Sequence, residues 1–308
     1  MKVFHEINEN KNLALALGYF DGVHIGHRKL LTTFVQEAKK QGLKTAVITF
    51  SQIPSNYFSD KEILSIQTFK DREMILATLG IDYLYELNFE EYKDMDANVY
   101  LKDVLVKNFS PKIITVGYNH KFGKDKSGNP ALLREFEGQY GYNTIVIPEQ
   151  KYKDKDTVSS TEIRKRIEKG HLNAIKAFLG REFSVRNSVI HGNKLARTFG
   201  IPTANLVWPA SMVKLPYGVY FGFVQVDSKI KPALISWGVK PTVTNGQNEV
   251  LEAHIHDFDE NLYGKIIKVM FSQKLRDEEN FGSPLVLRTQ LQKDYAAFQK
   301  WAFLKTKN

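Results

Sequence analysis

Residues 13–31 read LALALGYFDGVHIGHRKLL, an apolar run that passes through three glycines into a segment with helical spacing. The continuously apolar part, 13–17, is typical of a strand buried on both faces of a sheet. Over 28–41 one helical stripe is apolar, and Gly42 ends it. The side chains of that stripe are Leu30, Leu31, Phe34, Val35 and Ala38. The stretch therefore predicts a strand, a glycine-rich turn and a helix.

The same alternation of strand and helix continues through the first half of the chain. Extended apolar runs, which predict strands, occupy 44–50, 82–87, 112–117 and 143–147. Segments with helical spacing occupy 69–79, 98–109 and the neighbourhood of 130–138. Strands separated by helices indicate βαβ units and a parallel sheet.

The sequence pattern changes after Gly180, from alternating strands and helices to mainly β-type segments. The rest of the chain is rich in short β-type runs with turn residues between them, which indicates an antiparallel sandwich or a small barrel. A final helix is expected to open at Ser283 and Pro284, a good N-cap followed by a good first position. Residues 157–180 are expected to be helical and to join the halves. We therefore predict two domains, 1–180 and 181–308.

Composition narrows the classes of function. The 308 residues contain no cysteine, which excludes disulfides, thiolate catalysis and cysteine-ligated zinc. The net charge is +9, and the basic residues are dispersed, which favours a phosphorylated small molecule over nucleic acid as the partner. Residues 1–12 lack the apolar core of a signal peptide, and no run suits a membrane helix. We expect a cytoplasmic protein.

The glycine-rich turn has the ingredients of an anion site. Ligands of a βαβ sheet bind beyond the carboxyl ends of the strands, where residues 18–27 lie. Glycines let backbone N–H groups approach an anion, and the following helix adds its positive N-terminal end. His24 and His27, three apart, can face one ligand and stabilise charge on a transferring phosphoryl group. A glycine turn with two surface histidines is the simpler interpretation, but the complete set favours a nucleotide site.

These residues resemble a known family. GYFDGVHIGH (18–27) is similar to the HxGH signature of nucleotidyltransferases, in the form found in bacterial FAD synthetase, the adenylyltransferase half of the bifunctional riboflavin kinase/FAD synthetase. The resemblance continues in VGYNHKFGKDKSG (116–128), in VSSTEIRKRI (158–167) and, in the second half, in HGNKLARTFGIPTANL (191–206), which resembles the flavokinase PTAN region.

The resemblance implies a fold and two reactions. It implies an α/β chain with an N-terminal Rossmann-like parallel-sheet domain and a C-terminal antiparallel β-barrel domain that ends in a helix. The first domain would join FMN and ATP into FAD and pyrophosphate, and the second would phosphorylate riboflavin with ATP, both with Mg²⁺. Flavins and nucleotides would be the partners, with no nucleic acid or membrane; the oligomeric state is left open.

It also implies the residues of the first site. His24 and His27 would be catalytic. Contacts with ATP or its phosphates would come from Gly18, Phe20, Asp21, Gly22, Gly26, Ser160, Thr161 and Arg164. Asn119 and Phe122 would contact the flavin or the nucleotide. The SSTEIR segment has a purely structural interpretation too, because Ser159 and Glu162 form a capping box that starts a helix.

In the second half, Thr203 and Asn205 alternate around Ala204, so in an extended segment their oxygens converge and suit Mg²⁺. A Pro-Thr turn with an asparagine cap is the alternative. The resemblance makes Glu252 the base that takes a proton from the ribityl hydroxyl. By alternation Glu252 shares a face with His254 and His256, and an exposed polar face would explain all three.

Some positions depart from the family pattern. FSQIP (50–54) stands where the family has FDPHP, and SWGVKPT (236–242) stands where it has NIGxRPT. Ala196 replaces a glycine, and Lys240 replaces an arginine whose planar fork a lysine does not reproduce. Two alternatives therefore stay open. One is a monofunctional FMN adenylyltransferase with a weak or inactive kinase domain, and the other is a non-catalytic flavin-responsive regulator, with RNA as one candidate partner.

Overall fold

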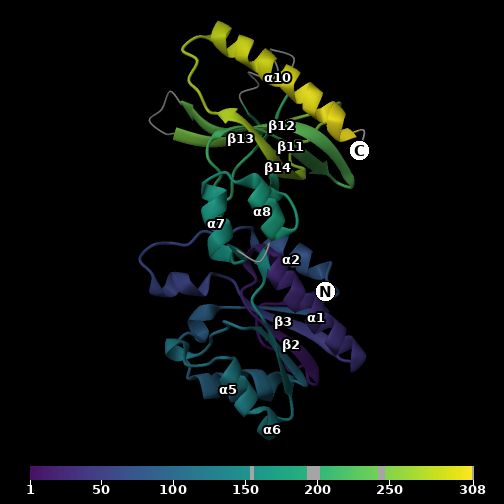
Figure 1. The fold of residues 1–308 in the computed structure, drawn as a ribbon, viewed down its shortest axis with the longest axis vertical. Helices are drawn as coiled ribbons and strands as arrows, with labels where there is room; N and C mark the ends of the chain where they lie inside the picture. Colours follow the sequence, from purple (N-terminus) through teal and green to yellow (C-terminus); the bar gives the residue numbers. More distant parts are fainter. Residues whose placement is uncertain (153–155, 193–201, 242–246, 307–308) are drawn as a thin grey trace. The chain divides into compact units, whose positions relative to one another are not determined.

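The computed structural model describes residues 1–152, 156–192, 202–241 and 247–306. The chain forms two compact units, Met1–Glu162 and Ile163–Asn308 (Figure 1). Two helices of the joining segment, α7 (Ser160–Glu168) and α8 (Leu172–Leu179), fall largely in the second unit by packing. The predicted functional boundary at residue 180 stays a prediction.

The first unit is built on a six-stranded sheet in which every pair of neighbours is parallel. In spatial order its strands are β1 (Lys2–Phe4), β4 (Tyr83–Leu87), β3 (Lys44–Phe50), β2 (Leu13–Leu17), β5 (Ile113–Gly117) and β6 (Asn143–Ile147). The predicted strands 13–17, 44–50 and 143–147 are confirmed residue for residue, whereas β1 was not predicted. The chain runs outward from β2 through β3 to β4 and then returns to β5, so the strand order reverses between β2 and β5. In such sheets ligands bind at the carboxyl ends of strands at this reversal.

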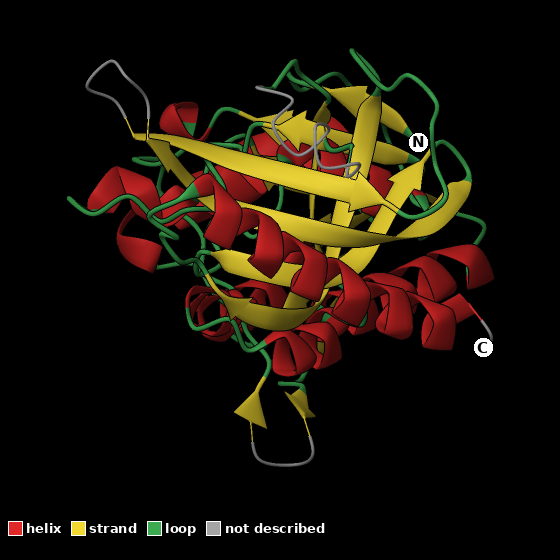
Figure 2. Cartoon of the chain, turned by 90° about the horizontal axis from the view of Figure 1, so that it is seen from above, coloured by secondary structure: helices red, strands yellow, loops and turns green. Residues whose placement is uncertain are grey.

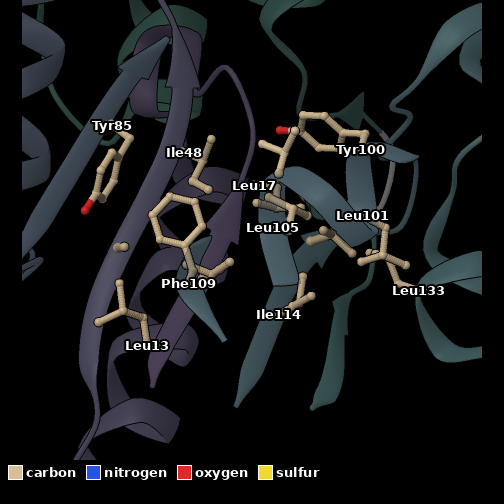
Figure 3. Close-up of a cluster of buried hydrophobic side chains, with 14 of the residues drawn as sticks. Leu13, Leu17, Ile48, Tyr85, Tyr100, Leu101, Leu105, Phe109, Ile114 and Leu133 are labelled. Atoms are coloured by element: carbon tan, nitrogen blue, oxygen red, sulfur yellow. The ribbon is translucent and has the colours of Figure 1, made fainter. Parts of the chain in front are cut away.

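The central strand β2 is buried on both faces, as its unbroken apolar run predicts. Its three leucines enter one core together with Tyr100, Leu101 and Phe109 (Figure 3). Its alanines, Ala14 and Ala16, enter the other core together with Leu31 and Phe34 of α1 (Ile25–Lys40). Small side chains on that face let α1 approach the sheet closely.

The remaining helices are shorter. They are α2 (Phe69–Ala77), α5 (Pro130–Glu135), α6 (Glu137–Tyr140) and the continuous segment α3 (Ala97–Val99), η4 (Tyr100–Val106) and α4 (Lys107–Phe109). That segment confirms the helix predicted at 98–109, but η4 is a π-helix. The wider winding places Tyr100, Leu101, Val104 and Leu105 inward, where all four are buried. Asn108 Nδ2 donates to the carbonyls of Asp103 and Val104 at 2.9 Å each.

One-turn helices and a small hairpin complete the first unit. They are η1 (Asp21–Val23), η2 (Pro54–Phe58), η3 (Phe89–Glu91), η5 (Lys124–Lys126), β7 (Lys151–Tyr152) and β8 (Asp156–Thr157). Among the residues described, no helix of either unit is both long enough and apolar enough to cross a membrane.

The second unit is a six-stranded antiparallel sheet whose long strands appear in yellow in Figure 2. In spatial order the strands are β10 (Ala204–Leu206), β13 (Gln247–Ile255), β12 (Lys229–Pro241), β11 (Gly218–Val226), β14 (Ile266–Asp277) and β9 (Phe183–Ser188). Just after β9, Ile190 pairs with Asn205 of β10, and its N–H lies 2.8 Å from the Asn205 carbonyl. This bridge joins the two edges of the sheet, so the predicted barrel is confirmed over the predicted alternative of a sandwich.

The interior of the barrel explains one departure from the family pattern. Trp237 is fully buried, its ring lies 4.5 Å from that of Trp208, and its Nε1–H donates to the Leu215 carbonyl at 3.0 Å. Ser236, its neighbour on β12, is exposed on the opposite face. The bulky Trp237 therefore fills the barrel core and does not lie on the face that carries Ser236.

The terminal helix α10 (Pro284–Thr306) begins as predicted, with the Val286 N–H 3.4 Å from the Ser283 hydroxyl. Phe298 of α10 is fully buried against Phe221 and Leu234 of the barrel. An ion pair with a buried carboxylate adds to this contact, because the partly exposed Arg276 of β14 holds Asp294 of α10 with an Nη2–Oδ2 distance of 2.7 Å. Asp294 is 3% exposed and also accepts a hydrogen bond from Gln290.

We predict that Asp294→Ala destabilises the second unit by about 3–5 kcal/mol, because it leaves the Arg276 guanidinium without its carboxylate. Urea unfolding followed by tryptophan fluorescence measures this unit alone, since the three tryptophans are Trp208, Trp237 and Trp301. Lys229→Ala, which breaks a largely exposed pair with Glu260, is the matched control and should cost no more than about 1 kcal/mol. Equal effects of the two variants would contradict the prediction.

Candidate functional site

The turn after β2 is closely packed around its glycines. The ring of Phe20 lies over Gly18, where a Cβ would come within 2.9 Å of a ring carbon. Phe20 is 3% exposed and has a left-handed backbone, with φ 56° and ψ 34°. Gly22 also has positive φ, at 76°, a conformation that favours glycine. The turn therefore depends on glycine at positions 18 and 22.

His24 and His27 face each other at the start of α1. His24 is the N-cap, and its Nδ1 accepts the backbone N–H of His27 at 3.2 Å. A neutral His24 therefore carries its proton on Nε2. The two rings stack with centroids 3.6 Å apart and planes 18° apart, and the edge of Phe20 packs on His27. The predicted pairing of the histidines on one side of the helix start is confirmed, while their catalytic role stays a prediction.

His27 lies in surroundings that disfavour its charged form. Burial, then the charges of His24 and Arg72, holds the pKa of His27 well below its usual range. Its Nδ1 is buried and has no hydrogen-bond partner among the described residues. His27 therefore remains a neutral imidazole near pH 7, able to donate one proton to an oxygen without carrying a net charge.

The start of α7 reaches the same turn. The Ser160 hydroxyl donates to the backbone carbonyl of Asp21 at 3.0 Å. The Ser159 hydroxyl accepts the N–H of Glu162 at 3.3 Å, which confirms the helix-capping half of the predicted capping box. Thr161 is exposed beside Ser160, and Arg164 lies one turn further along the helix, partly buried. The structure brings Ser160 to the glycine turn, as a shared phosphate site requires.

Asp21 and Gly26 have clear structural tasks. Both carboxylate oxygens of Asp21 lie near the backbone N–H of Ile66, at 3.0 and 3.2 Å, and the side chain is 3% exposed. Asp21 thus ties the segment that precedes α2 to the turn. At Gly26 a Cβ would lie 3.2 Å from the His24 ring, so glycine permits the histidine stack. Contacts of these residues with ATP stay predictions.

The segment after β5 forms the other side of the strand reversal. Asn119 is exposed two residues beyond the strand. Phe122 and Gly128 exchange backbone hydrogen bonds of 3.1 and 2.9 Å, and the Phe122 ring packs on Gly128 and on Tyr100. Phe122 thus holds the loop on the core, and its predicted contact with a ligand stays a prediction.

Sequence reasoning did not single out His120. Its ring stacks on Phe122, and burial lowers the pKa of His120 to about 4.

At the carboxyl end of β3, where the family has FDPHP, Ser51 and Gln52 are exposed and Ile53 is buried.

The barrel brings together two of the residues predicted for the second site, Asn205 and Glu252. Asn205 of β10 lies directly opposite Glu252 of β13, which lies directly opposite Ser236 of β12. Asn205 Nδ2 is 3.4 Å from the Thr203 carbonyl, which leaves Oδ1 as an acceptor. A Cβ on Gly192 would lie 2.4 Å from the Asn205 side chain, so glycine is needed there. Ala196 and the side chain of Lys240 lie outside the described residues.

His254 was not assigned a role from the sequence. It is 7% exposed, packs against Tyr295 of α10, and its Nδ1 lies 2.8 Å from the carbonyl of Pro202. Burial lowers its pKa, so His254 is neutral and donates from Nδ1. The interpretation of Glu252, His254 and His256 as an exposed polar face is wrong for His254, because α10 covers it. The alternation that pairs it with Glu252 was the available signal.

Comparison with known protein families agrees with the division of the chain into two units. A model of the FAD synthetase family matches residues 6–162, and a model of the riboflavin kinase family matches residues 179–302.

Curated relatives match nearly the whole chain. Two of them are named bifunctional riboflavin kinase/FMN adenylyltransferase. The protein of Buchnera aphidicola subsp. Schizaphis graminum is 32% identical to this chain over 296 residues, which cover 95% of both chains. The protein of Haemophilus influenzae is 33% identical over 285 residues, which cover 91% of both chains. A solved structure named as a macrolide-efflux protein from Streptococcus pneumoniae superposes with a TM-score of 0.85 at 30% identity, covering 96% of each chain.

We predict that His27 remains neutral in an NMR pH titration down to pH 6, where a free imidazole of pKa about 6.5 is mostly protonated. Because the unfolded chain takes up this proton and the folded chain does not, the free energy of unfolding should fall as pH drops below about 6.5. The spectrum of His27→Gln assigns the resonance. A titration midpoint of His27 at or above 6.5 would contradict the prediction.

Proposed function

The chain belongs to the bifunctional riboflavin kinase/FAD synthetase family, and from that membership we propose how its two sites act. The protein transfers the adenylyl group of ATP to FMN, and it phosphorylates riboflavin to FMN. The observation that carries this function is the match of both family models, together with bifunctional relatives over more than nine-tenths of the chain. A silent kinase half and a non-catalytic regulator are therefore not favoured.

For adenylyl transfer we assign the turn after β2 and the start of α7. A phosphate oxygen of FMN attacks the α-phosphorus of ATP, the bond from that phosphorus to the bridging oxygen breaks, and pyrophosphate leaves. His24 and His27 donate hydrogen bonds to the oxygens on which charge develops. Ser160, Thr161 and Arg164 hold the phosphates at the helix start.

Two observations support this assignment. The stacked histidines stand at the carboxyl end of β2, where the strand order reverses. Ser160, although 139 residues away in sequence, contacts the same turn. We assign contact with the flavin or the nucleotide to Asn119, two residues beyond the neighbouring strand β5.

For riboflavin phosphorylation we assign the face formed by β10, β13 and β12. Glu252 takes the proton of the ribityl hydroxyl as that oxygen attacks the γ-phosphorus of ATP, and ADP leaves. Thr203 and Asn205 are the residues that would hold Mg²⁺. The donor set fits, because a hydroxyl and the amide Oδ1 of Asn205 are hard oxygen ligands. Bound Mg²⁺ would neutralise phosphate charge. We assign residues 1–180 to the first activity and 181–308 to the second.

The partners in this proposal are flavins and nucleotides, to which a net charge of +9 is suited. We propose a cytoplasmic location and no nucleic-acid partner. The oligomeric state forms no part of the proposal.

The function is tested by supplying ATP and Mg²⁺ with riboflavin alone or with FMN alone and separating the flavins by chromatography. We expect FMN and FAD from riboflavin, and FAD from FMN. His27→Asn should slow FAD formation about 100–1000-fold and spare FMN formation, and Glu252→Gln should slow FMN formation by about 100-fold or more and spare FAD formation. Each variant is the folding control for the other. FAD from FMN only would indicate an inactive kinase half, and no product from either flavin would refute the enzyme.

The metal assignment makes a separate prediction. Asn205→Ala should raise the Mg²⁺ concentration for half-maximal riboflavin phosphorylation about tenfold, because one oxygen ligand is lost. The Mg²⁺ dependence of FAD formation should stay the same. Asn261→Ala, at an exposed position of the same unit, is the matched control. An unchanged requirement for Mg²⁺ in Asn205→Ala would contradict the assignment.

A further inference from the structure

We propose that Arg72 is a positioning residue for adenylyl transfer, which fixes the phosphate-binding turn by tying together the ends of β2 and β3. The inference rests on the proposed adenylyl transfer at this turn. Arg72 lies on α2 and is 2% exposed.

The guanidinium of Arg72 makes two hydrogen bonds to backbone carbonyls. Nη1 donates to Tyr19 at 2.6 Å, and Nη2 donates to Phe50 at 2.9 Å. Tyr19 is the second residue after β2, and Phe50 is the last residue of β3. The hydroxyl of Thr49 donates to the same Tyr19 carbonyl at 3.1 Å. The peptide plane that precedes Phe20 is therefore held by two donors from outside the turn.

The surroundings of Arg72 show that its charge is not placed there for a strong ion pair. Its Nε is buried without a hydrogen-bond partner, and in the part of the chain that the structure describes no carboxylate lies within ion-pair distance of it. Its charge faces the rings of Tyr19 and Phe69, 4.3 and 5.0 Å from the ring centroids, and it also attracts the buried carboxylate of Glu86 from beyond ion-pair distance. A buried cation with an unmade hydrogen bond is costly, and residues kept at such a cost are concentrated at functional sites.

The contact chain from Arg72 leads directly to a proposed catalytic group. Fixing the Tyr19 carbonyl fixes the orientation of the next residue, Phe20, in its left-handed conformation, which a bulky residue adopts only under constraint. The Phe20 ring then lies over Gly18 and packs its edge on His27, with ring centroids 5.3 Å apart. Loss of the two carbonyl bonds would release this arrangement without removing any group that touches substrate.

The chemistry of the contact requires arginine in particular. A guanidinium presents several donors in a rigid plane and can bond both carbonyls while it stacks on Tyr19. A lysine is a single point charge and can bond one carbonyl at a time. The conservative variant should therefore restore part of the function that an apolar variant loses.

The test is steady-state kinetics of FAD formation by the full chain carrying Arg72→Met or Arg72→Lys. We expect kcat to fall about 100-fold in Arg72→Met and about 10-fold in Arg72→Lys, since small misplacements of catalytic groups cost this much. The KM for ATP should change less than about threefold, because the phosphate-binding groups remain. Riboflavin phosphorylation in the second unit should be unchanged. Arg134→Met, at an exposed arginine of the same unit, is the matched control.

The outcomes separate the possibilities. A kcat within twofold of the unaltered protein in Arg72→Met would overturn the proposal. An equal loss of kcat in Arg72→Met and Arg72→Lys would also overturn it. So would a fall of both FAD formation and riboflavin phosphorylation that follows a lower folded fraction in urea unfolding, because either result indicates a general structural role. Absence of FAD formation by the unaltered protein would refute the proposed function itself, independently of Arg72.

Discussion

The burial of β2 on both faces is the constraint on which the first unit depends. Leucines at alternate positions fill one core, and Ala14 and Ala16 between them allow α1 to lie close on the other face. Because β2 is central, β3 and β5 are both its neighbours, and the turn that follows it stands where the strand order reverses. The turn can therefore contain several glycines and two histidines, because the apolar strand and helix on either side hold its two ends.

Much of this architecture could be predicted from the sequence, because buried parallel strands have unbroken apolar sequences. The edge strand β1 escaped prediction because three residues carry no periodicity. The π-helical winding at Tyr100–Val106 escaped because seven residues cannot distinguish its period from that of an α-helix. Residues with a local motif, such as His24 and His27, were found. Arg72 and His254 were not, because they contact carbonyls 53 and 52 residues away, and strand alternation, the one local signal for His254, does not reveal such a contact.

The barrel shows why a departure from a family pattern need not damage a site. Trp237 and Ser236 are neighbours in sequence but point to opposite faces of β12. The indole enters the core, packs against Trp208 at a tilt and donates its N–H to the Leu215 carbonyl. The face that carries Glu252 and Asn205 therefore receives a small serine. Because side chains alternate between the two faces of a strand, Trp237 changes the packing of the core while Ser236 changes the chemistry of the opposite face. Two adjacent substitutions can therefore have independent effects.

The two sites also face different electrostatic problems, and their residues differ accordingly. At the adenylyl site two polyanions must meet, and a strongly charged pocket would bind the ground state as tightly as the transition state. In the proposed mechanism a neutral His27 would donate a hydrogen bond whose strength grows as charge develops on the oxygen, so that its contribution would fall mainly on the reacting state. At the proposed kinase site the attacking group is a neutral hydroxyl whose proton must be removed, a task that we assign to the carboxylate of Glu252. Burial, then the charges of His24 and Arg72, keeps His27 neutral by lowering its pKa, whereas Glu252 is partly exposed on its strand.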